Sequence, residues 1–253
     1  MFWTIYEDMD KWDFYRTDKI IYYKYRKERI KAEVFGMYYV VLDLEMCKVP
    51  KNYRSYRYRY AREIIQIGAV LLDEKFNQID TFSQYVKPKH GKVDNFIMNL
   101  TGIKSFQLKD APNLADALQN MVAWIGNKEY RVYTWSENDY DQLLREVVSK
   151  EISTPEFDEF MNMDRWFDYQ AIFDERFDYE KQVGLEDALM LCAIDPQGRF
   201  HDGLDDAINT AILISKLERE PNFQLTKFEY VANSEPVNTC LGELFGKLDL
   251  NIA

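Results

Sequence analysis

Two carboxylates stand close together at the end of a short apolar run. Asp43 and Glu45 follow residues 37–42, which are rich in strand formers and predict a buried strand. Alternate residues of a strand point to the same face, so both carboxylates can converge on one ion, and magnesium prefers such oxygen ligands. Two solvated acids at a loop entrance are the alternative, because a motif this short is weak evidence alone.

A second group of acids lies where a predicted strand gives way to a predicted helix. The candidates within residues 134–143 are Glu137, Asp139 and Asp141. Acids at the start of a helix are also favoured by capping and by the helix dipole. Helix capping is therefore the alternative to metal binding. The pattern alone does not select which of the three acids would bind a metal ion.

A histidine followed by two acids completes the set. His201 is one of only two histidines in the chain. An imidazole, with a reference pKa of about 6.5, can accept a proton from water near neutral pH. Asp205 stands four residues after the histidine and would be its nearer neighbour on a continuous helix, whereas Asp206 stands five residues after it. A helix-capping histidine beside surface acids is the alternative.

Together these groups suit the hydrolysis of a phosphodiester. Two metal ions roughly 3.5–4 Å apart can activate the attacking water and stabilise the leaving oxygen. A histidine near the same ions can remove the water's proton. Two acids on one strand, one acid after a later strand, and a histidine with an acid near the last helix predict this chemistry more strongly than any single group does.

The elements that must position these residues follow an α/β pattern. Runs of strand formers predict strands, and helical spacing of apolar residues predicts helices. The predicted strands cover residues 37–42, 64–72, 79–86, 130–134 and a fifth near 166–172. The predicted helices cover residues 113–125, 139–150, 184–193 and 204–218. Three successive strands followed by alternating strands and helices predict a mixed five-stranded sheet flanked by helices.

Five segments form a recognisable combination of motifs. They are Leu-Asp-Leu-Glu at 42–45, Glu-Ile-Ile-Gln-Ile-Gly-Ala-Val at 63–70, Phe-Ser-Gln-Tyr-Val-Lys-Pro at 82–88, Leu-Thr-Gly-Ile at 100–103 and Gly-Arg-Phe-His-Asp-Gly-Leu-Asp-Asp at 198–206. With them, residues 37–218 resemble the DEDDh exonucleases, and among these the ERI-type 3′-to-5′ exoribonucleases and their bacterial sporulation-inhibitor-like relatives. The resemblance implies a ribonuclease H-like fold, two magnesium or manganese ions, and stepwise release of nucleoside monophosphates from a 3′ end.

The same resemblance implies roles for individual residues. The metal ligands are expected to be four acids, namely Asp43, Glu45, Asp139 and Asp206. His201 takes the role of general base. The family's third motif has an aspartate five residues after the histidine, which selects Asp206 over Asp205 and requires His201 to precede the first helical turn. Asp139 is selected over Asp141 by its distance to a leucine of the following helix.

A basic segment is predicted to contact the substrate. The net charge of −11 argues against a general nucleic-acid binder, but residues 48–62 contain six Lys or Arg, four tyrosines and no acid. Cations can follow a phosphate backbone and aromatic rings can stack on bases, and Arg54, Arg57 and Arg59 lie in the middle of this segment. A solvated hairpin, or tyrosines that pack on one another or on a dimer partner, is the alternative.

Three more residues are predicted to lie against the substrate. Residues 100–103 are expected to form a turn at the substrate pocket, because the similar family segment lies there, which makes Thr101 and Gly102 candidates. Simple turn residues are the alternative. Met46 stands where many relatives carry a small residue, and it either packs against the terminal base or ribose or fills the core.

The length and composition of the chain predict how it is organised. Its 253 residues predict an N-terminal extension over 1–35, with a helix expected within 20–31, an exonuclease domain over 36–220 and a C-terminal extension over 221–253. The three cysteines show no CxxC spacing, so neither a disulfide framework nor a zinc site is expected, and cytoplasmic location is the default. Neither a secretory signal nor a membrane span is expected.

Three functions compete, two of them enzymatic and one a binding role. The leading one is an exonuclease on single-stranded RNA or short oligonucleotides, with RNA favoured over DNA. A DNA-trimming or proofreading exonuclease is the second, because the motifs do not identify a contact to the 2′-hydroxyl. A regulatory binding protein that has kept the fold is the third, although all five expected catalytic residues are present. Tyrosine-rich ends also suggest a possible homodimer.

Overall fold

The computed structural model describes residues 36–53 and 61–225. Several predictions fall outside these residues: the N-terminal extension with its helix, most of the C-terminal extension, and Arg54, Arg57 and Arg59 of the basic segment. The division of the chain into a domain with two extensions therefore stays a prediction. No helix within the two described ranges combines the length and the apolar character needed to cross a membrane.

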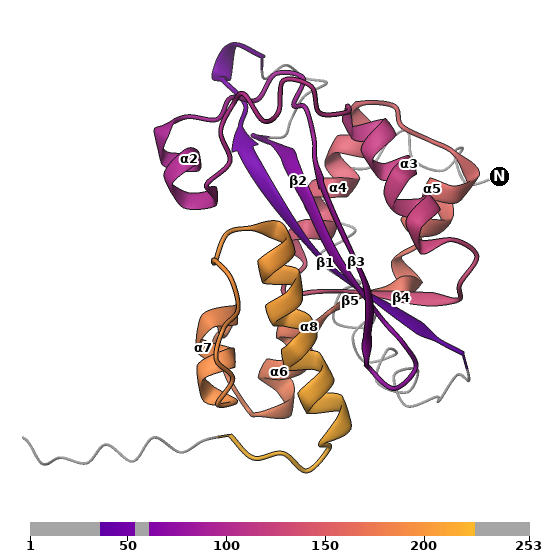
Figure 1. Ribbon diagram of the computed structural model, residues 1–253, viewed down its shortest axis with the longest axis vertical. Coiled ribbons are helices and arrows are strands. Elements are labelled where there is room, and N and C mark those ends of the chain that lie inside the picture. The colour runs from indigo at the N-terminus through magenta and orange to yellow at the C-terminus, as the bar shows by residue number, and fades with distance from the viewer. Residues whose placement is uncertain (1–35, 54–60, 226–253) are drawn as a thin grey trace, which may run out of the picture.

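A mixed five-stranded sheet forms the centre of the molecule (Figure 1). Its strands are β1 (Tyr38–Lys48), β2 (Arg62–Leu72), β3 (Gln78–Tyr85), β4 (Tyr130–Thr134) and β5 (Trp166–Asp168), in the order β3-β2-β1-β4-β5. The β1–β2 and β2–β3 pairs are antiparallel, whereas β1–β4 and β4–β5 are parallel. The sequence prediction of a mixed five-stranded sheet is confirmed.

Helices cover both faces of this sheet. They are α2 (Asn95–Thr101), α3 (Leu114–Ile125), α4 (Asn138–Ser149), α5 (Pro155–Phe160), α6 (Tyr169–Arg176), α7 (Leu185–Leu191) and α8 (Gly203–Arg219), with short 3₁₀ turns at Lys51–Tyr53 and Met163–Arg165. Side chains of α3, α4 and α5 pack with one face of the sheet, and side chains of α6, α7 and α8 pack with the other. The two apolar layers hold the sheet between them, and α2 lies near its end (Figure 1).

Two boundaries differ from those expected. β1 runs to Lys48 rather than ending at residue 42, because its second half pairs with the first half of β2. Asp43 and Glu45 therefore lie inside a paired strand and not at its end. The fifth strand is short because Asp168 caps α6, with its side chain accepting a hydrogen bond from the backbone N–H of Ala171. Such local bonds compete with continued strand pairing.

The segment 100–103 also differs from expectation. Residues 100 and 101 belong to the last turn of α2, and Gly102 ends that helix in the left-handed conformation with φ 73°. A glycine at this position is the usual way to end a helix, because it adopts positive φ without a steric penalty. The segment is therefore a helix end rather than an isolated turn.

Candidate active site

The first two acids point to the same face of the central strand. Val41 precedes Asp43 by two residues and packs in the apolar layer of α6 to α8. Leu42 and Leu44 pack in the opposite layer. Side chains alternate along a strand, so Asp43 and Glu45 face α8. A bulge follows at once, since the register with β2 shifts between Glu45 and Met46. The expected convergence of the two carboxylates on one face is therefore present.

Helix α8 is brought against this face by an unusually close backbone contact. A Cβ added to Gly68 of β2 would fall 2.1 Å from the carbonyl carbon and oxygen of Gly203, the first residue of α8. The side chain of Gln66 reinforces the contact, because it accepts a hydrogen bond from the Gly203 N–H at 3.1 Å and donates one to Asp202 Oδ1 at 3.2 Å. The start of α8 is thus held directly over β1 and β2.

At the start of α8, the neighbouring residues Asp205 and Asp206 point in different directions. His201 precedes the helix, with φ 63°, and its backbone N–H donates to Asp206 Oδ2 at 2.8 Å. Asp205 turns the other way and accepts a hydrogen bond from the Arg199 N–H at 2.8 Å. The condition for selecting Asp206, a histidine outside the helix, is therefore met. Asp206 is buried beside the acids of β1, and Asp205 supports the preceding loop.

The acids after β4 are separated in the same way. Asp139 is buried in the first turn of α4, and its carboxylate accepts a hydrogen bond from the backbone N–H of Leu44. Asp141 lies half-exposed, with its carboxylate 3.9 Å from the guanidinium of Arg145. Glu137 stands at the N-cap position without a side-chain capping bond. Asp139 is thus the acid that the structure brings to β1.

Five predicted residues therefore meet at one place. One ligand atom each from Glu45, His201 and Asp206 lies within 4.8 Å of the others. Asp43 and Asp139 are near enough for their charges to act on this group. These residues come from three elements, β1, the start of α4 and the start of α8, which lie far apart along the chain.

Burial and mutual repulsion raise the pKa of every acid in this group. Burial, together with the charges of Asp139 and Asp206, raises the pKa of Asp43 well above its usual range. Burial and the neighbouring acids raise the pKa of Glu45 to about 8. Burial raises the pKa of Asp139 to about 7 and that of Asp206 to about 6, although backbone N–H groups oppose both shifts. A divalent cation would relieve this repulsion.

The donor set fits a divalent metal ion. Asp206 Oδ1 is buried and accepts no hydrogen bond from any residue within 36–53 or 61–225. A buried carboxylate oxygen without a partner is costly, and in native sites an ion or water usually supplies the missing contact. The four carboxylates offer the hard oxygen ligands that magnesium and manganese accept, and the imidazole adds a nitrogen beside them.

Two residues that position the site were not predicted from the sequence. Gln66 stands inside an apolar strand segment, and a buried polar residue in such a run is the signal that could have marked it. Arg199 lies two residues before His201, and its guanidinium donates to the backbone carbonyls of Asn99 and Leu100 at 2.6 and 2.9 Å. It therefore joins the end of α2 to the loop that carries the histidine.

The three residues predicted to contact substrate have mixed surroundings. The buried hydroxyl of Thr101 donates to the carbonyl of Ile97 and accepts from the N–H of Ile103, so its bonds are satisfied within the fold. Gly102 lies against Arg199, whose guanidinium would be 2.0 Å from an added Cβ. Met46 is partly buried and packs against the apolar layer of α3 to α5. Their contact with a substrate stays a prediction.

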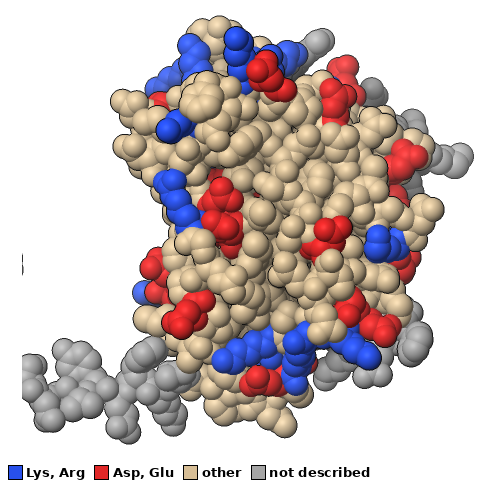
Figure 2. Space-filling view, viewed as in Figure 1, with Lys and Arg blue, Asp and Glu red and all other residues tan. Residues whose placement is uncertain are grey.

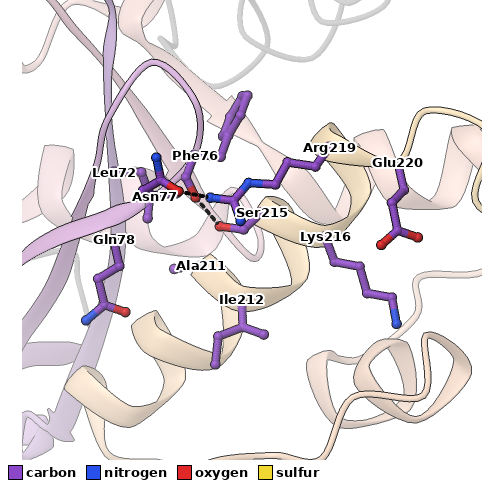
Figure 3. Close-up of a pocket in the computed structure, with 10 residues that line it drawn as sticks. All are labelled: Leu72, Phe76, Asn77, Gln78, Ala211, Ile212, Ser215, Lys216, Arg219 and Glu220. Atoms are coloured by element: carbon purple, nitrogen blue, oxygen red, sulfur yellow. Dashed lines mark hydrogen bonds between the residues drawn. The ribbon is translucent and has the colours of Figure 1, made fainter.

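A cavity of about 550 Å³ lies elsewhere, between the C-terminal half of α8 and the turn that joins β2 to β3 (Figure 3). Of its two cations, Lys216 and Arg219, the second donates to Asn77 Oδ1, and Ser215 Oγ donates to the carbonyl of Phe76. Both polar groups thus tie α8 to the turn. Glu220 is the one acid in its lining, so the cavity lacks the acidic group just described.

Comparisons with known proteins agree with this arrangement. A family model described as an exonuclease matches residues 40–214, a range that includes the four acids of the site and His201. The Homo sapiens protein named ERI1 exoribonuclease 2 is 30% identical over 216 residues, which cover 76% of this chain and 30% of that protein. The Rattus norvegicus protein named 3′-5′ exoribonuclease 1 is 26% identical over 201 residues, which cover 75% of this chain and 56% of that protein. The chain thus spans less than a third of the human relative.

Solved structures show the same fold. The nuclease domain of 3′hExo, described as a DEDDh family member bound to rAMP, has a TM-score of 0.62 and 24% identity, covering 78% of this chain and 99% of that one. E. coli Exonuclease I in complex with a dT13 oligonucleotide has a TM-score of 0.55 and 14% identity, covering 73% of this chain and 42% of that one. The predicted ribonuclease H-like fold is confirmed.

Proposed function

The chain belongs to the exonuclease family whose model spans residues 40–214, and we propose that it is a metal-dependent 3′-to-5′ exonuclease acting on single-stranded RNA. One observation carries the proposal. The buried Asp206 Oδ1 has no partner among the described residues, in a group where Glu45, His201 and Asp206 place ligand atoms within 4.8 Å of one another. Such a group is built to take up positive charge and to act on a water molecule.

Four acids would hold the metal: Asp43, Glu45, Asp139 and Asp206. Two magnesium or manganese ions, when bound, supply an activated water and stabilise charge on the leaving oxygen. The protein's own contribution is to keep these carboxylates converged although they repel one another. The Leu44 N–H holds Asp139, and the His201 N–H holds Asp206, so each carboxylate keeps one oriented oxygen.

His201 is placed to receive the proton of the attacking water. Its side chain is exposed, with a ring nitrogen within 4.8 Å of carboxylate oxygens of Glu45 and Asp206, while its backbone N–H is bonded to Asp206. The left-handed backbone, unusual for a non-glycine residue, lets the chain turn sharply before α8 begins. The backbone of His201 is therefore held against the acid group, which keeps its imidazole within reach of a water molecule there.

The preference for RNA rests on the relatives. Those with the greatest similarity given above carry names that describe exoribonucleases. A DNA substrate is the competing possibility, since the fold also occurs in Exonuclease I bound to a dT13 oligonucleotide. The chain spans only part of its relatives, so the substrate of the whole protein is part of the proposal.

The test uses end-labelled single-stranded RNA and DNA of one sequence, with magnesium, manganese or chelator. The expected result is metal-dependent shortening from the 3′ end, faster on RNA, which Asp43→Asn abolishes. Asp141→Asn is the matched control, because this half-exposed acid faces Arg145 and should leave cleavage intact. Cleavage of neither polymer would contradict the enzyme proposal, and faster cleavage of DNA would contradict the preference for RNA.

His201 has its own test. His201→Gln should still bind the substrate, while its turnover falls by roughly 10²–10⁴-fold, the usual contribution of a general base. The measurement is single-turnover cleavage alongside binding by fluorescence anisotropy. Wild-type turnover in this variant would remove His201 from the mechanism.

A further inference from the structure

One end of the molecule is basic although the chain carries a net charge of −11. Exposed lysines lie there, and we call six of them the basic cap: Lys48, Lys51, Lys87, Lys92, Lys104 and Lys109. Within residues 48–53, 61–65 and 85–111, which surround them, the exposed acids are Asp94 and Asp110, while Glu63 is buried. Figure 2 shows blue side chains gathered at this upper end, above α2.

The lysines belong to separate segments, which hydrogen bonds and a small apolar cluster hold together. The Lys92 N–H donates to the Lys48 carbonyl at 3.0 Å, and the Lys87 N–H donates to the Pro112 carbonyl at 2.8 Å. In the turn after α2, Gln107 accepts from the Lys104 N–H and donates to the Tyr85 hydroxyl at the end of β3. A small apolar cluster lies beneath, formed by Cys47, Ile65, Ile97, Ile103 and Leu108.

Aromatic rings stand exposed among these cations. Phe106 lies in the same turn, between Lys104 and Lys109, and 72% of it is exposed to solvent. Tyr53 is 43% exposed and stacks on His90 with the ring centroids 4.9 Å apart. Exposed rings interleaved with cations are typical of surfaces that bind single-stranded nucleic acids, because bases stack on the rings while the cations contact phosphates. A duplex offers no unstacked base to such a ring.

The basic cap begins close to the acidic group. Lys48 follows Glu45 by three residues on the same strand, a separation of about 10 Å at the usual rise of a β-strand. Arg199 connects the two regions from the other side, because it bonds the carbonyls at the end of α2 and lies near His201. A strand whose 3′ end reaches the acids would therefore continue over the cap.

We propose that the basic cap binds the single-stranded substrate backbone a few nucleotides to the 5′ side of the scissile bond, and that Phe106 stacks on one of its bases. The proposal rests on the proposed function for the direction of the strand. It identifies the substrate as an oligonucleotide with an unpaired 3′ tail of several nucleotides. Lysines of the cap then contribute to affinity, and none of them takes part in bond cleavage.

The test compares charge-reversed proteins. The cap variant carries Lys92→Glu and Lys104→Glu, with Lys109→Glu added in a second version, and the control matched to the first version carries Lys75→Glu and Lys181→Glu, which are exposed lysines outside the cap. The cap variant should bind a single-stranded 12-mer at least tenfold more weakly. In the second version, the plot of log affinity against log salt should be shallower by about 2, because three phosphate contacts of about 0.7 each are lost. The control should match the wild type.

Phe106→Ala tests the stacking in the same assay, with Met190→Ala, an apolar side chain that is 51% exposed, as its control. Binding to the single-stranded 12-mer should weaken roughly 5- to 100-fold, as expected for the loss of one base–aromatic stack. Binding to a blunt duplex should weaken less than binding to the single strand, both in the cap variant and in Phe106→Ala. Equal losses on duplex and single strand, or no loss on the single strand, would overturn the proposal.

Anisotropy in chelator keeps this test separate from the proposed function. Binding by the basic cap does not require metal, so wild-type protein should bind the 12-mer when cleavage is blocked. If the protein binds in this way but cleaves nothing with metal, the proposed function fails and the cap remains supported. If it cleaves a dinucleotide and the 12-mer equally well, and the cap variant does the same, the cap proposal fails and the proposed function remains.

Discussion

Gly68 of β2 and Gly203 of α8 touch through their backbones. A Cβ on Gly68 would fall 2.1 Å from the carbonyl carbon of Gly203, and a Cβ on Gly203 would be 3.4 Å from the carbonyl oxygen of Asp43. No side chain fits between the strand and the helix at this point. The contact therefore sets how near the first turn of α8, which carries Asp206, comes to the acids of β1.

Gly68→Ala should push α8 away from the sheet. We expect a loss of about 1–3 kcal/mol in the free energy of unfolding, the usual range for overpacking, together with weaker metal binding. Thermal unfolding and calorimetric metal titration measure the two effects. Gly184→Ala is the control, because its new Cβ meets nothing closer than 3.9 Å. Unchanged stability and metal affinity in Gly68→Ala would mean that the helix position is not set here.

Asp206→Asn and Asp205→Asn form a matched pair on adjacent residues. Asp206 carries the buried oxygen without a partner, whereas Asp205 accepts a bond from the Arg199 N–H. Asp206→Asn should lower kcat/KM roughly 10²-fold or more, since even the outer partners of metal ligands are worth 10–100-fold. Asp205→Asn should have a far smaller effect. The rates of metal-dependent cleavage by the two variants are the measurement. Equal losses in both would contradict the assignment of Asp206 as the metal ligand.

Lys150 places one positive charge between two buried carboxylates. Its Nζ lies 3.1 Å from Glu63 Oε1 and 2.5 Å from Glu146 Oε2, and both carboxylates are fully buried. Glu146 also accepts a hydrogen bond from the Ile64 N–H, which ties α4, and with it Asp139, to β2. Lys150→Met should cost about 3–5 kcal/mol in the free energy of unfolding, the usual result of leaving a buried charge unpaired.

Chemical denaturation measures the effect of Lys150→Met, with Lys181→Met as the exposed control. The loss should be larger at alkaline than at acidic pH, because low pH can protonate the carboxylates left without their cation. A loss no larger than that of the control would show that the carboxylates are neutral without Lys150.

The acid group should make the stability of the metal-free protein depend on pH. The pKa values of about 8 for Glu45, about 7 for Asp139 and about 6 for Asp206 lie above the unfolded values near 4. Between these limits the folded state holds more protons than the unfolded state, so stability falls as pH rises from about 4 to about 8. Magnesium should therefore raise Tm more at about pH 8 than at about pH 5, because it binds the ionised acids.

Thermal unfolding at both pH values, with magnesium and with chelator, measures this linkage. Asp206→Asn should reduce the magnesium-dependent rise in Tm. A magnesium effect that is equal at both pH values would mean that the acids do not exchange their protons for the ion.

Local patterns were sufficient where a residue's environment depends on its near neighbours. The apolar run of β2 predicted a buried strand, and the spacing of Leu114, Ala117 and Leu118 predicted α3, which begins after its expected cap, Asn113. The alternation of Asp43 and Glu45 correctly predicted a shared face. These features follow from the fixed periods of strands and helices, 2 and 3.6 residues.

Longer-range pairing decided what those patterns left open. Residues 43–48 became strand because β2 supplies their partners, which no local pattern reveals. Asp139 rather than Asp141 is buried because the Leu44 N–H and the sheet meet only one side of α4. The family spacing had selected Asp206, and the structure gives the physical reason, since His201 turns at positive φ before α8 begins.

The sequence by itself determined the types of residue available for catalysis, four acids and a histidine, and the strands and helices that carry most of them. The tertiary structure decided which acids meet and how closely, through the contact of Gly68 with Gly203 and the bonds of Gln66 to the start of α8. The physical reason is that periodicity orients a side chain relative to its own element. The distance between elements is set by packing between residues far apart in the chain.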